Sequence, residues 1–358
     1  MVRGIELDNV EGTVAVNQNR LLNQAACVNI DNTLSVSNAL YLFTNNYFGS
    51  AGGAYDIDVS HADGSNNSFV FSNNQFFGGN NEAILMALTS AAAESPNFVE
   101  ITNNVFNSYG IPFNVSLNGY ENCDLTMTNN TISTSASYGA SISANNNSNL
   151  TGNIKDNVMT SSEYSLFLGN SGSSTCSVNI QNNTLNSPYY PLNLETSGIS
   201  YTGQITGNTI YAADNDELFF WNIGGTCAAS ATVAGNFFSG GYYVLDIENN
   251  STGTSNITIA NNVVESTAAP AFYLHNNAAN QYNLTVENNT LSGAGVGNAI
   301  QVVNDAGNTC LEFNNNTADA WPNAFSLTRS GGNLYVVTPT GNQGQIVQSG
   351  TTPVTTCP

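Results

Sequence analysis

Apolar and polar residues alternate over short stretches of this chain, and each stretch ends in the same polar pair. The clearest copy is 125–132, Leu-Thr-Met-Thr-Asn-Asn-Thr-Ile, and similar phrases stand at 99–106, 178–185, 257–264 and 284–291. Alternation with a period of two predicts a half-buried β-strand, because successive side chains of a strand point to opposite faces. No apolar run has the period of a helix, so helical repeats are excluded.

The second asparagine of this phrase recurs along nearly the whole chain at intervals of 25 to 30 residues. The twelve copies are Asn19, Asn46, Asn74, Asn104, Asn130, Asn157, Asn183, Asn208, Asn236, Asn262, Asn289 and Asn316. So steady a period is typical of a solenoid, in which each repeat forms one coil and packs on its neighbours. We predict an all-β fold, a parallel β-helix solenoid of about twelve coils.

Each position of the repeat has a structural interpretation when the recurring asparagine is numbered zero. Positions −5 and −3 are apolar, as in Leu125 and Met127, and position +2 is apolar again, as in Ile132. A second alternating pair usually follows at +9 and +11, as in Phe113 and Val115. Each coil therefore contains two or three short strands whose apolar side chains point inward.

The asparagine pair itself predicts a corner and an internal ladder. Position −1 is Asn, Asp or Gly in eleven of the twelve copies, the residues that most easily accept a positive φ. Position zero is always Asn and never Gly or Asp, so tolerance of a positive φ does not explain why this residue recurs. A carboxamide both donates and accepts hydrogen bonds, and we expect these side chains to stack from coil to coil as a buried asparagine ladder.

The unbroken repeat predicts one β-helix domain over 1–329. After residue 329 the asparagine register is lost and Pro339, Pro353 and Pro358 follow, so 330–358 is interpreted as a C-terminal cap or linker. The first residues lack the apolar core of a signal peptide, and the repeat is in register by Val14. We expect the chain to be part of a longer exported protein that is secreted or held at the cell surface.

The charge balance limits the partners of this protein. Four Lys and Arg stand against twenty-five Asp and Glu, a net charge of −21, whereas nucleic-acid binding needs clustered basic residues. No apolar stretch reaches the length of a membrane span. The expected partner is therefore a surface glycan or a protein, with no nucleic acid and no membrane insertion. An uncapped end would expose a sheet edge, so end-to-end association is a further expectation.

The six cysteines predict little chemistry. They are Cys27, Cys123, Cys176, Cys227, Cys310 and Cys357. Their spacing places no two in adjacent regular coils, and coils two apart are about 9.6 Å apart, too far for a disulfide. We interpret them as small buried side chains, and Cys310 with Cys357 is the one bridge to consider, because the tail can fold back. No Cys-x-x-Cys metal spacing occurs.

Carboxylates at outward positions of the first coils form one candidate site. Alternation predicts that Asp31, Asp56 and Asp58 point outward and that Asp31 lies beside Asp58, with His61 and Asp63 following. Crowded carboxylates repel one another unless a cation or a proton intervenes, and Ca²⁺ prefers oxygen ligands. Calcium is the one cofactor considered, and a solvated acidic ladder without an ion is the alternative. The same two alternatives, a calcium site or a solvated acidic ladder, apply more weakly to two other groups: Asp246 with Glu248, and Asp214, Asp216 and Glu217.

Aromatic residues form the second candidate site. Alternation predicts that Phe219, Trp221 and Phe272 point inward. The side chains predicted to be accessible, outward or in turns, are Tyr190, Phe220, Tyr243 and Tyr273. Such a surface can stack on sugar rings or contact a partner protein, although aromatic residues at coil corners can also serve packing alone. His275, outward beside Tyr273, is interpreted as a surface residue.

The repeated phrase, apolar-x-apolar-x-Asn-Asn-x-apolar, resembles the right-handed parallel β-helix of the pectin-lyase-like superfamily over about 14–327. Four short motifs are also similar to repeats of the polymorphic outer-membrane proteins of the autotransporter class. They are Phe-x-x-Asn at 43–46, 71–74 and 313–316, and Gly-Gly-Ala-Tyr at 52–55. This resemblance implies an autotransporter-like passenger.

Enzymatic members of that superfamily are a poor match. Its lyases use an Arg or Lys base beside calcium-bound acids, whereas Arg20, Lys155 and Arg329 here belong to coils one, six and twelve. The Asn-Thr-Asp, Asp-Asp and Gly-His-Gly motifs of its hydrolases are absent from the sequence. A negative surface also repels anionic uronates.

The sequence therefore favours a non-catalytic exported β-helix scaffold, adhesin-like or passenger-type, that binds a host, glycan or protein partner. Whether the chain is an enzyme stays open. One alternative is a carbohydrate-active enzyme acting on a neutral polysaccharide through Asp56, Asp58, His61 and Asp63. The other is a structural rod without a ligand.

Overall fold

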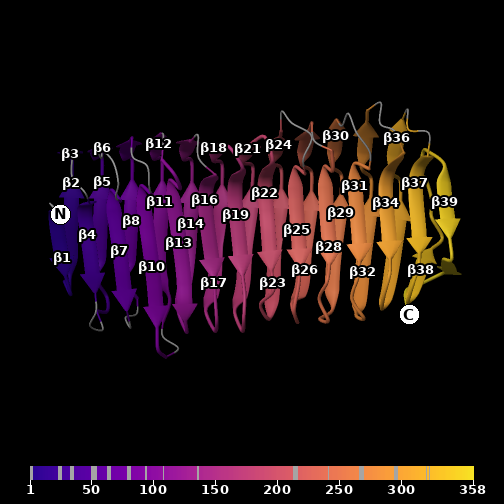
Figure 1. Ribbon diagram of the computed structural model, residues 1–358, viewed down its shortest axis with the longest axis horizontal. Helices are drawn as coiled ribbons and strands as arrows, with labels where there is room; N and C mark the ends of the chain where they lie inside the picture. Colours follow the sequence, from indigo (N-terminus) through magenta and orange to yellow (C-terminus); the bar gives the residue numbers. More distant parts are fainter. Residues whose placement is uncertain are drawn as a thin grey trace. The chain divides into compact units, whose positions relative to one another are not determined.

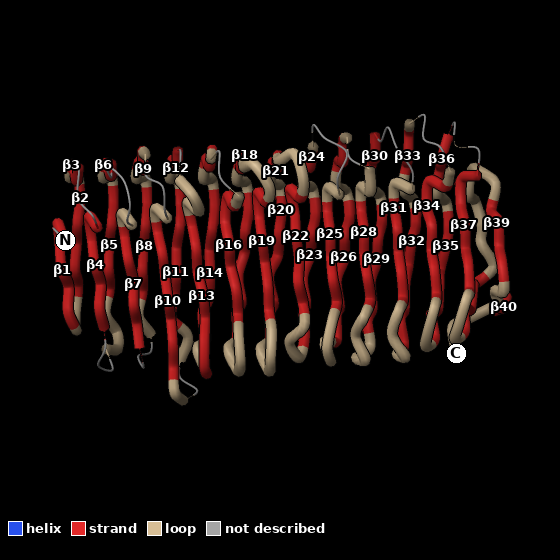
Figure 2. The backbone as a smooth tube through the Cα atoms, in the orientation of Figure 1, coloured by secondary structure: helices blue, strands red, loops and turns tan. Residues whose placement is uncertain are grey.

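The computed structural model describes residues 3–22, 26–32, 36–49, 55–62, 66–78, 82–92, 95–107, 109–134, 137–212, 217–240, 242–265, 270–293, 297–319, 321 and 323–358. All regular elements in these ranges are β-strands (Figure 2). The chain divides into two compact units, Met1–Asn179 and Ile180–Pro358. In each unit the strands recur in groups of three, one for each of three parallel sheets, here named A, B and C (Figure 1).

The first unit begins each sheet. Sheet A contains β1 (Arg3–Asp8), β4 (Ala26–Asn32), β7 (Ile57–Ala62), β10 (Ile84–Ser90), β13 (Phe113–Gly119), β16 (Tyr138–Ala144) and β19 (Tyr164–Asn170). Sheet B contains β2 (Thr13–Asn17), β5 (Leu40–Thr44), β8 (Ser68–Ser72), β11 (Asn97–Thr102), β14 (Asn122–Thr128), β17 (Asn149–Lys155) and β20 (Thr175–Gln181), whose sequence includes the unit boundary. Sheet C contains β3 (Arg20–Leu22), β6 (Tyr47–Gly49), β9 (Gln75–Phe77), β12 (Val105–Asn107), β15 (Thr131–Ser133) and β18 (Val158–Thr160).

The second unit repeats the arrangement. Sheet A contains β22 (Tyr190–Thr196), β25 (Phe219–Ile223), β28 (Leu245–Asn249), β31 (Phe272–Asn276), β34 (Asn298–Asn304), β37 (Asn323–Arg329) and β39 (Ile346–Ser349). Sheet B contains β23 (Ser200–Thr206), β26 (Ala228–Ala234), β29 (Ser255–Ala260), β32 (Gln281–Glu287), β35 (Asn308–Asn314), β38 (Asn333–Val337) and β40 (Thr352–Val354). Sheet C contains β21 (Thr184–Asn186), β24 (Thr209–Tyr211), β27 (Phe237–Ser239), β30 (Val263–Glu265), β33 (Thr290–Ser292) and β36 (Thr317–Asp319).

One coil consists of a sheet B strand, the asparagine corner, a short sheet C strand and a sheet A strand. Successive repeats align position on position, so that Val99 pairs with Leu125 and Ile101 with Met127. Among the described residues, each of the twelve recurring asparagines is followed by one sheet C strand. The all-β parallel solenoid of about twelve coils is thereby confirmed.

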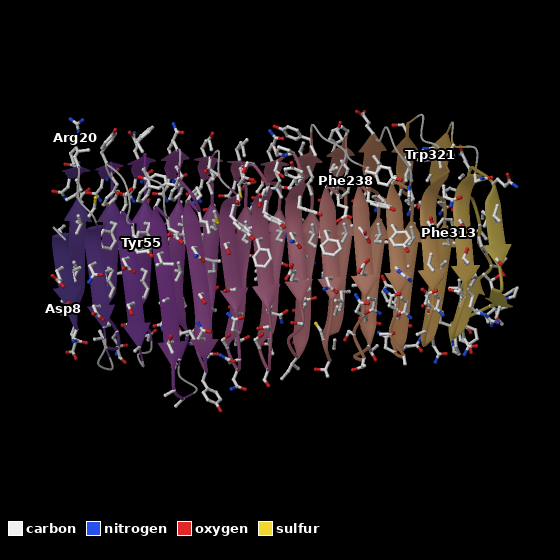
Figure 3. All side chains as sticks on the ribbon, viewed as in Figure 1. Asp8, Arg20, Tyr55, Phe238, Phe313 and Trp321 are labelled. Atoms are coloured by element: carbon white, nitrogen blue, oxygen red, sulfur yellow. A yellow bond between two sulfur atoms is a disulfide. The ribbon has the colours of Figure 1, made fainter. Side chains whose placement is uncertain are left out.

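The core is the inside of the coils, as the alternation predicts. Leu125, Met127 and Ile132 are at most 1% exposed, and Phe113 and Val115 are fully buried. Position-on-position stacking places like residues together, and the rings of some neighbours lie flat on one another. Examples are Tyr41 on Phe69, with centroids 5.0 Å apart, and Phe76 on Phe106, at 4.7 Å. In the second unit, Phe238 and Phe313 (Figure 3) are fully buried in the same way.

The asparagine ladder is present in both units. The Oδ1 of Asn130 accepts bonds from the backbone N–H and the Nδ2 of Asn104, at 2.9 and 3.1 Å, and the Asn104 Nδ2 also donates to the Phe71 carbonyl at 2.8 Å. Eleven of the twelve predicted asparagines are at most 2% exposed. Asn19 is the exception and is exposed: it belongs to the first coil, its backbone N–H and Nδ2 donate forward to the Oδ1 of Asn46, and its Nδ2 also donates to the Asn17 carbonyl.

The residue before each ladder asparagine has the left-handed backbone that the sequence predicts. In all twelve copies φ lies between 54° and 67°. Even Gln18, the one copy that is not Asn, Asp or Gly, has a φ of 58°. The corner geometry therefore follows from the repeat and overrides the residue's own preference.

The ladder also continues beyond the point where the sequence analysis ends it. Asn342 accepts bonds from the backbone N–H and the Nδ2 of Asn316, at 2.9 and 3.1 Å, and Gly341 before it has a φ of 68°. The prediction that the register is lost after residue 329 is wrong. Pro339 at position −3 and Gly344 at +2 replace the apolar residues by which the other copies were found.

The last residues extend the sheets of the second unit. Strand β38 pairs with β35, β39 with β37 and β40 with β38. The unit boundary at 179/180 differs from the domain boundary predicted at 329/330. That 330–358 serves as a cap or linker stays a prediction.

The cysteines behave as the sequence analysis expects. Cys310 and Cys357 form a disulfide, with Cα atoms 5.7 Å apart. Cys27, Cys123, Cys176 and Cys227 are at most 2% exposed. The tail is therefore covalently tied to β35, while the other cysteines fill space in the coils.

A second interior ladder was not predicted. In the second unit, the Nδ2 of Asn249 donates to the Oδ1 of Asn276 at 3.0 Å, and the Nδ2 of Asn276 donates to the Oδ1 of Asn304 at 2.9 Å. All three are fully buried at the ends of sheet A strands. Their spacing from the main ladder varies, which hid them in the sequence.

Within the described ranges, no helix is present that has the length and apolarity of a membrane span.

The ladder gives the first testable prediction. Replacing Asn262 by Ala removes the acceptor of the Asn236 backbone N–H and Nδ2, and buried unpaired donors cost about 1–3 kcal/mol each. We expect Asn262→Ala to lower the free energy of unfolding by about 3 kcal/mol in chemical denaturation. Asn256→Ala, at an exposed position bonded to Asn283, should cost less than about 0.5 kcal/mol. Equal losses in the two variants would contradict the ladder's structural role.

The disulfide gives the second testable prediction. Its two cysteines are 47 residues apart in the sequence, and closing a loop of that length stabilises the native state by up to about 4 kcal/mol in the chain-entropy model. We expect Cys357→Ser to make 330–358 sensitive to limited proteolysis and to lower the denaturation midpoint. A reducing agent should lower the midpoint of the wild type and leave that of Cys357→Ser unchanged. A wild type that is insensitive to reduction would refute this prediction.

Candidate functional site

The strongest candidate site lies on the outward face of sheet A in the second unit, on neighbouring strands β22, β25, β28 and β31 (Figure 1). The inward residues of these strands, such as Phe219, Trp221 and Phe272, are fully buried, as predicted. The residues between them point outward, and register aligns them in rows. One row reads Asn193, Phe220, Asp246, Tyr273. The next row reads Glu195, Asn222, Glu248, His275.

The four aromatic residues predicted to be accessible lie on or beside this face as two pairs, one on each side of Asp246. Tyr190, Phe220, Tyr243 and Tyr273 are all partly exposed. The ring of Tyr190 lies 6.4 Å from that of Phe220, and the ring of Tyr243 lies 5.7 Å from that of Tyr273. Tyr242, 43% exposed, packs edge-on against Tyr243 at 4.8 Å. Together with Asn193 and Asp246, the four residues Tyr190, Phe220, Tyr243 and Tyr273 are here named the aromatic–acid face.

Asp246 occupies an unusual position in this face. Phe220 and Tyr273 flank it on the two adjacent strands, and strands in a sheet are only about 4.8 Å apart. Although Asp246 is on the outward side of the sheet, it is 5% exposed, and its Oδ1 has no hydrogen-bond partner. Asn193, at the other side of Phe220, is 4% exposed, and its Oδ1 also lacks a partner. Buried polar atoms are almost always paired, so two unpaired oxygens in one row set these two side chains apart from the other outward residues of the row.

The face is electrostatically negative. Burial, followed by the nearby Glu217 and Glu248 carboxylates, raises the pKa of the Asp246 carboxyl to about 8. Burial and neighbouring acidic groups also raise the pKa of the Tyr243 and Tyr273 phenols. Every charge acting on Asp246 is negative, so the site destabilises its own ionised form.

A hydrogen-bonded chain borders the face. The Tyr273 hydroxyl lies 3.2 Å from Nδ1 of His275, whose Nε2 lies 2.8 Å from Oδ2 of Asp305. The Ser330 hydroxyl donates to Asp305, and this bond together with His275 lowers the pKa of that carboxyl. Tyr–His–Asp is an arrangement that can activate a nucleophile, but a phenol whose pKa is raised stays protonated. The hydrogen-bonded series of Tyr273, His275 and Asp305 therefore orients the Tyr273 hydroxyl and does not activate it as a nucleophile.

The acidic site predicted in the first coils is not assembled as expected. Asp31 is paired with Ser60, and Asp58 with Asn29, so the two carboxylates are offset by two residues instead of adjacent. The expectation assumed equal turn lengths, and the turns of the two coils differ in length. The described residues contain no group of three His, Cys, Asp or Glu side chains that can hold a metal ion. Calcium at Asp31, Asp56 and Asp58 stays a prediction that this geometry does not favour.

Two members of the predicted enzymatic group point inward. Asp56 is fully buried, accepts a bond from the Tyr109 hydroxyl and lies 3.3 Å from Sγ of Cys27. Its pKa is raised to about 6 by burial, against the lowering effect of these two contacts. His61 is 1% exposed and is bonded to the interior amides of Asn32 and Asn67. The outward assignment of Asp56 is wrong because it precedes β7, at the corner where alternation does not yet apply. Asp63, Asp214 and Asp216 lie outside the described residues.

Sequence reasoning found the parts of the aromatic–acid face without joining them. It placed Phe220 and Tyr273 outward and treated Asp246 with Glu248 as a minor acidic pair. Asn193 was missed, because an isolated asparagine in a chain this rich in asparagine carries no signal. Only the register between strands shows that a carboxyl lies between two rings.

Residues 142–318 match the family model described as right handed beta helix region. No curated protein and no solved structure matched the chain. The matched segment contains the strands of the aromatic–acid face. With its parallel sheets and asparagine corners, the protein is a right-handed parallel β-helix, as the repeated phrase indicates.

The buried carboxyl generates a pH prediction. A folded pKa near 8 against about 3.9 in the unfolded chain means that the native state binds the extra proton between these values. Stability from this group is complete below about pH 4 and is lost as the pH rises to about 8, by at most about 1.4 kcal/mol per pH unit. We expect the free energy of unfolding of Asp246→Asn, relative to that of wild type, to increase steadily over that pH range in a series of denaturation experiments. Glu312→Gln, an exposed outward change on β35, is the matched control. A constant difference between Asp246→Asn and wild type would show that Asp246 titrates normally.

Proposed function

We propose that this β-helix is an exported, adhesin-like surface scaffold that binds a glycan through the aromatic–acid face. The single observation that supports this is the convergence of four partly exposed aromatic side chains around two orphaned polar oxygens. Aromatic rings provide flat apolar surfaces for sugar rings. Asn193 and Asp246 add an amide and a carboxyl beside these rings, and such groups hydrogen-bond sugar hydroxyls once a ligand enters between the rings, so the face offers both components of carbohydrate recognition.

Secretion or display at the cell surface belongs to this proposal. It is supported by the polar composition, with 8% charged residues and only four Lys and Arg, and by the disulfide that joins the tail to β35, since disulfides persist in oxidising compartments. Kinship to autotransporter passengers is a narrower proposal that rests on the three Phe-x-x-Asn motifs and the one Gly-Gly-Ala-Tyr motif. A protein partner at the same face and end-to-end association through terminal strands are further proposals of the same kind.

The enzymatic alternative loses its physical basis. A polysaccharide outside the coils cannot reach Asp56 and His61, which are at most 1% exposed. Asp58 alone does not supply the pair of carboxyl groups that glycoside hydrolysis needs. A structural rod without a ligand is left as the outcome if no binding is found.

The proposal is tested by a glycan array and a polysaccharide-turnover assay on the same sample, with and without calcium. We expect binding without product release. Phe220→Ala, Tyr243→Ala and Tyr273→Ala should each weaken binding about fivefold to tenfold, the equivalent of one lost ring stack. Tyr211→Ala, an exposed tyrosine on sheet C, is the matched control, and Asp58→Ala should bind as wild type does.

Other outcomes identify the alternatives. Oligosaccharide release that disappears in Asp58→Ala would make the protein an enzyme. Binding that is insensitive to all three aromatic variants would place the site elsewhere. Silence in both assays would leave a structural rod.

A further inference from the structure

The negative potential at Asp246 has no counterion of the chain's own. Every charged group with a resolved effect on its carboxyl is an acid, namely Glu217 ahead of β25 and Glu248 on β28. The remaining titratable groups on or next to the surrounding strands are Tyr190 and Glu195 on β22, Tyr242 and Tyr243 before β28, and Tyr273 and His275 on β31. His275 is already within 2.8 Å of Asp305. From residue 180 onward the sequence has one Lys or Arg, Arg329, which is on β37.

The orphaned Oδ1 of Asp246 sets the chemistry of the missing group. It is buried on the outward side of the sheet between two aromatic neighbours and has no donor among the described residues, so a ligand that enters between the two rings would supply the donor. A neutral hydroxyl donates a hydrogen bond but does not offset the negative charges of Glu217 and Glu248. A cation does both, and it favours the ionised form of Asp246.

The aromatic residues favour an organic cation over a metal ion. Tyr243 and Tyr273 are 5.7 Å apart with their planes tilted by 46°, and Phe220 stands on the other side of Asp246. Ring faces attract ammonium groups and pack against methyl or methylene groups, as in aromatic cages. The chain itself places the Arg20 guanidinium 5.2 Å from the ring centroid of Tyr47. A metal ion such as Ca²⁺ needs six to eight oxygens, which aromatic walls do not supply.

We infer that the aromatic–acid face seats an alkylammonium group, with the cation against Asp246 and its alkyl substituents against Phe220, Tyr243 and Tyr273. This inference rests on the proposed function and deepens it: the glycan recognised is one that carries a cationic amine or quaternary ammonium. Glu217 and Glu248 add long-range attraction. Anionic glycans are repelled by the same charges.

The experiment measures binding of choline and of its neutral isostere 3,3-dimethylbutan-1-ol by isothermal titration calorimetry. We expect choline to bind at least tenfold more tightly. Choline keeps its charge at every pH, so pH dependence reports the protein. Because Asp246 is protonated below about pH 8, the affinity for choline should rise at least tenfold between pH 6 and pH 8.5, with release of up to one proton, measured from buffers of different ionisation heat.

Variants separate charge from stacking. Asp246→Asn should abolish the preference for choline, the pH dependence and the proton release, while neutral glycans that bind the rings still bind. Glu312→Gln should leave all three unchanged. Chitosan oligomers should bind more tightly than chitin oligomers of the same length, which extends the preference from quaternary ammonium groups to primary amines.

The inference and the proposed function fail in different ways. Equal affinity for choline and its isostere, without proton release, would overturn the cation seat, and aromatic-dependent binding of neutral glycans would still support the glycan scaffold. Calcium binding that depends on Asp246, without choline binding, would replace the organic cation by a metal. A silent glycan array with tight choline binding would instead overturn the glycan as the carrier, in favour of a methylated protein.

Discussion

Every other feature of each unit depends on the hydrogen bond that a buried carboxamide makes to the same residue of the next coil. Asn104, for example, both donates to Asn130 along the stack and ties the Phe71 carbonyl to the corner. A buried amide left unpaired costs free energy, so the asparagine corner of each coil must align with the corner of the next coil. The ladder therefore sets the register of the strands that leave the corner.

Register has a consequence for the surface. Because each strand pairs position on position with the next, inward residues form continuous stacks and outward residues form continuous rows. The row that contains Phe220, Asp246 and Tyr273 is such a product. A single coil presents one aromatic ring or one carboxyl, and three coils together enclose the carboxyl between rings. The proposed binding surface is thus a property of neighbouring coils, and its outward side chains are separate from those of the ladder.

The two acidic candidates differ for a physical reason. Near the N-terminus, Asp56 points into the coils, where Tyr109 and Cys27 satisfy it, so its burial serves structure. Asp246 is almost equally buried but lies on the outward face, and its Oδ1 has no partner within the protein. The hydrogen bonds of Asp56 account for its burial, whereas the unpartnered Oδ1 of Asp246 beneath partly exposed rings is what motivates the proposed ligand site.

The sequence alone determined the all-β solenoid, the asparagine ladder, the left-handed corners and the alternation that turns Phe220 and Tyr273 outward, because these depend on local period and residue type. It also pointed to the Cys310–Cys357 bridge. Only the tertiary structure decided which outward residues are neighbours, since turn lengths vary between coils and shift register by one or two residues. That shift separates Asp31 from Asp58, and it brings Asn193, Asp246 and the four aromatic residues together. The rung at Asn342 was likewise hidden, because its flanking positions carry Pro339 and Gly344, and only the hydrogen bonds of the folded chain reveal it.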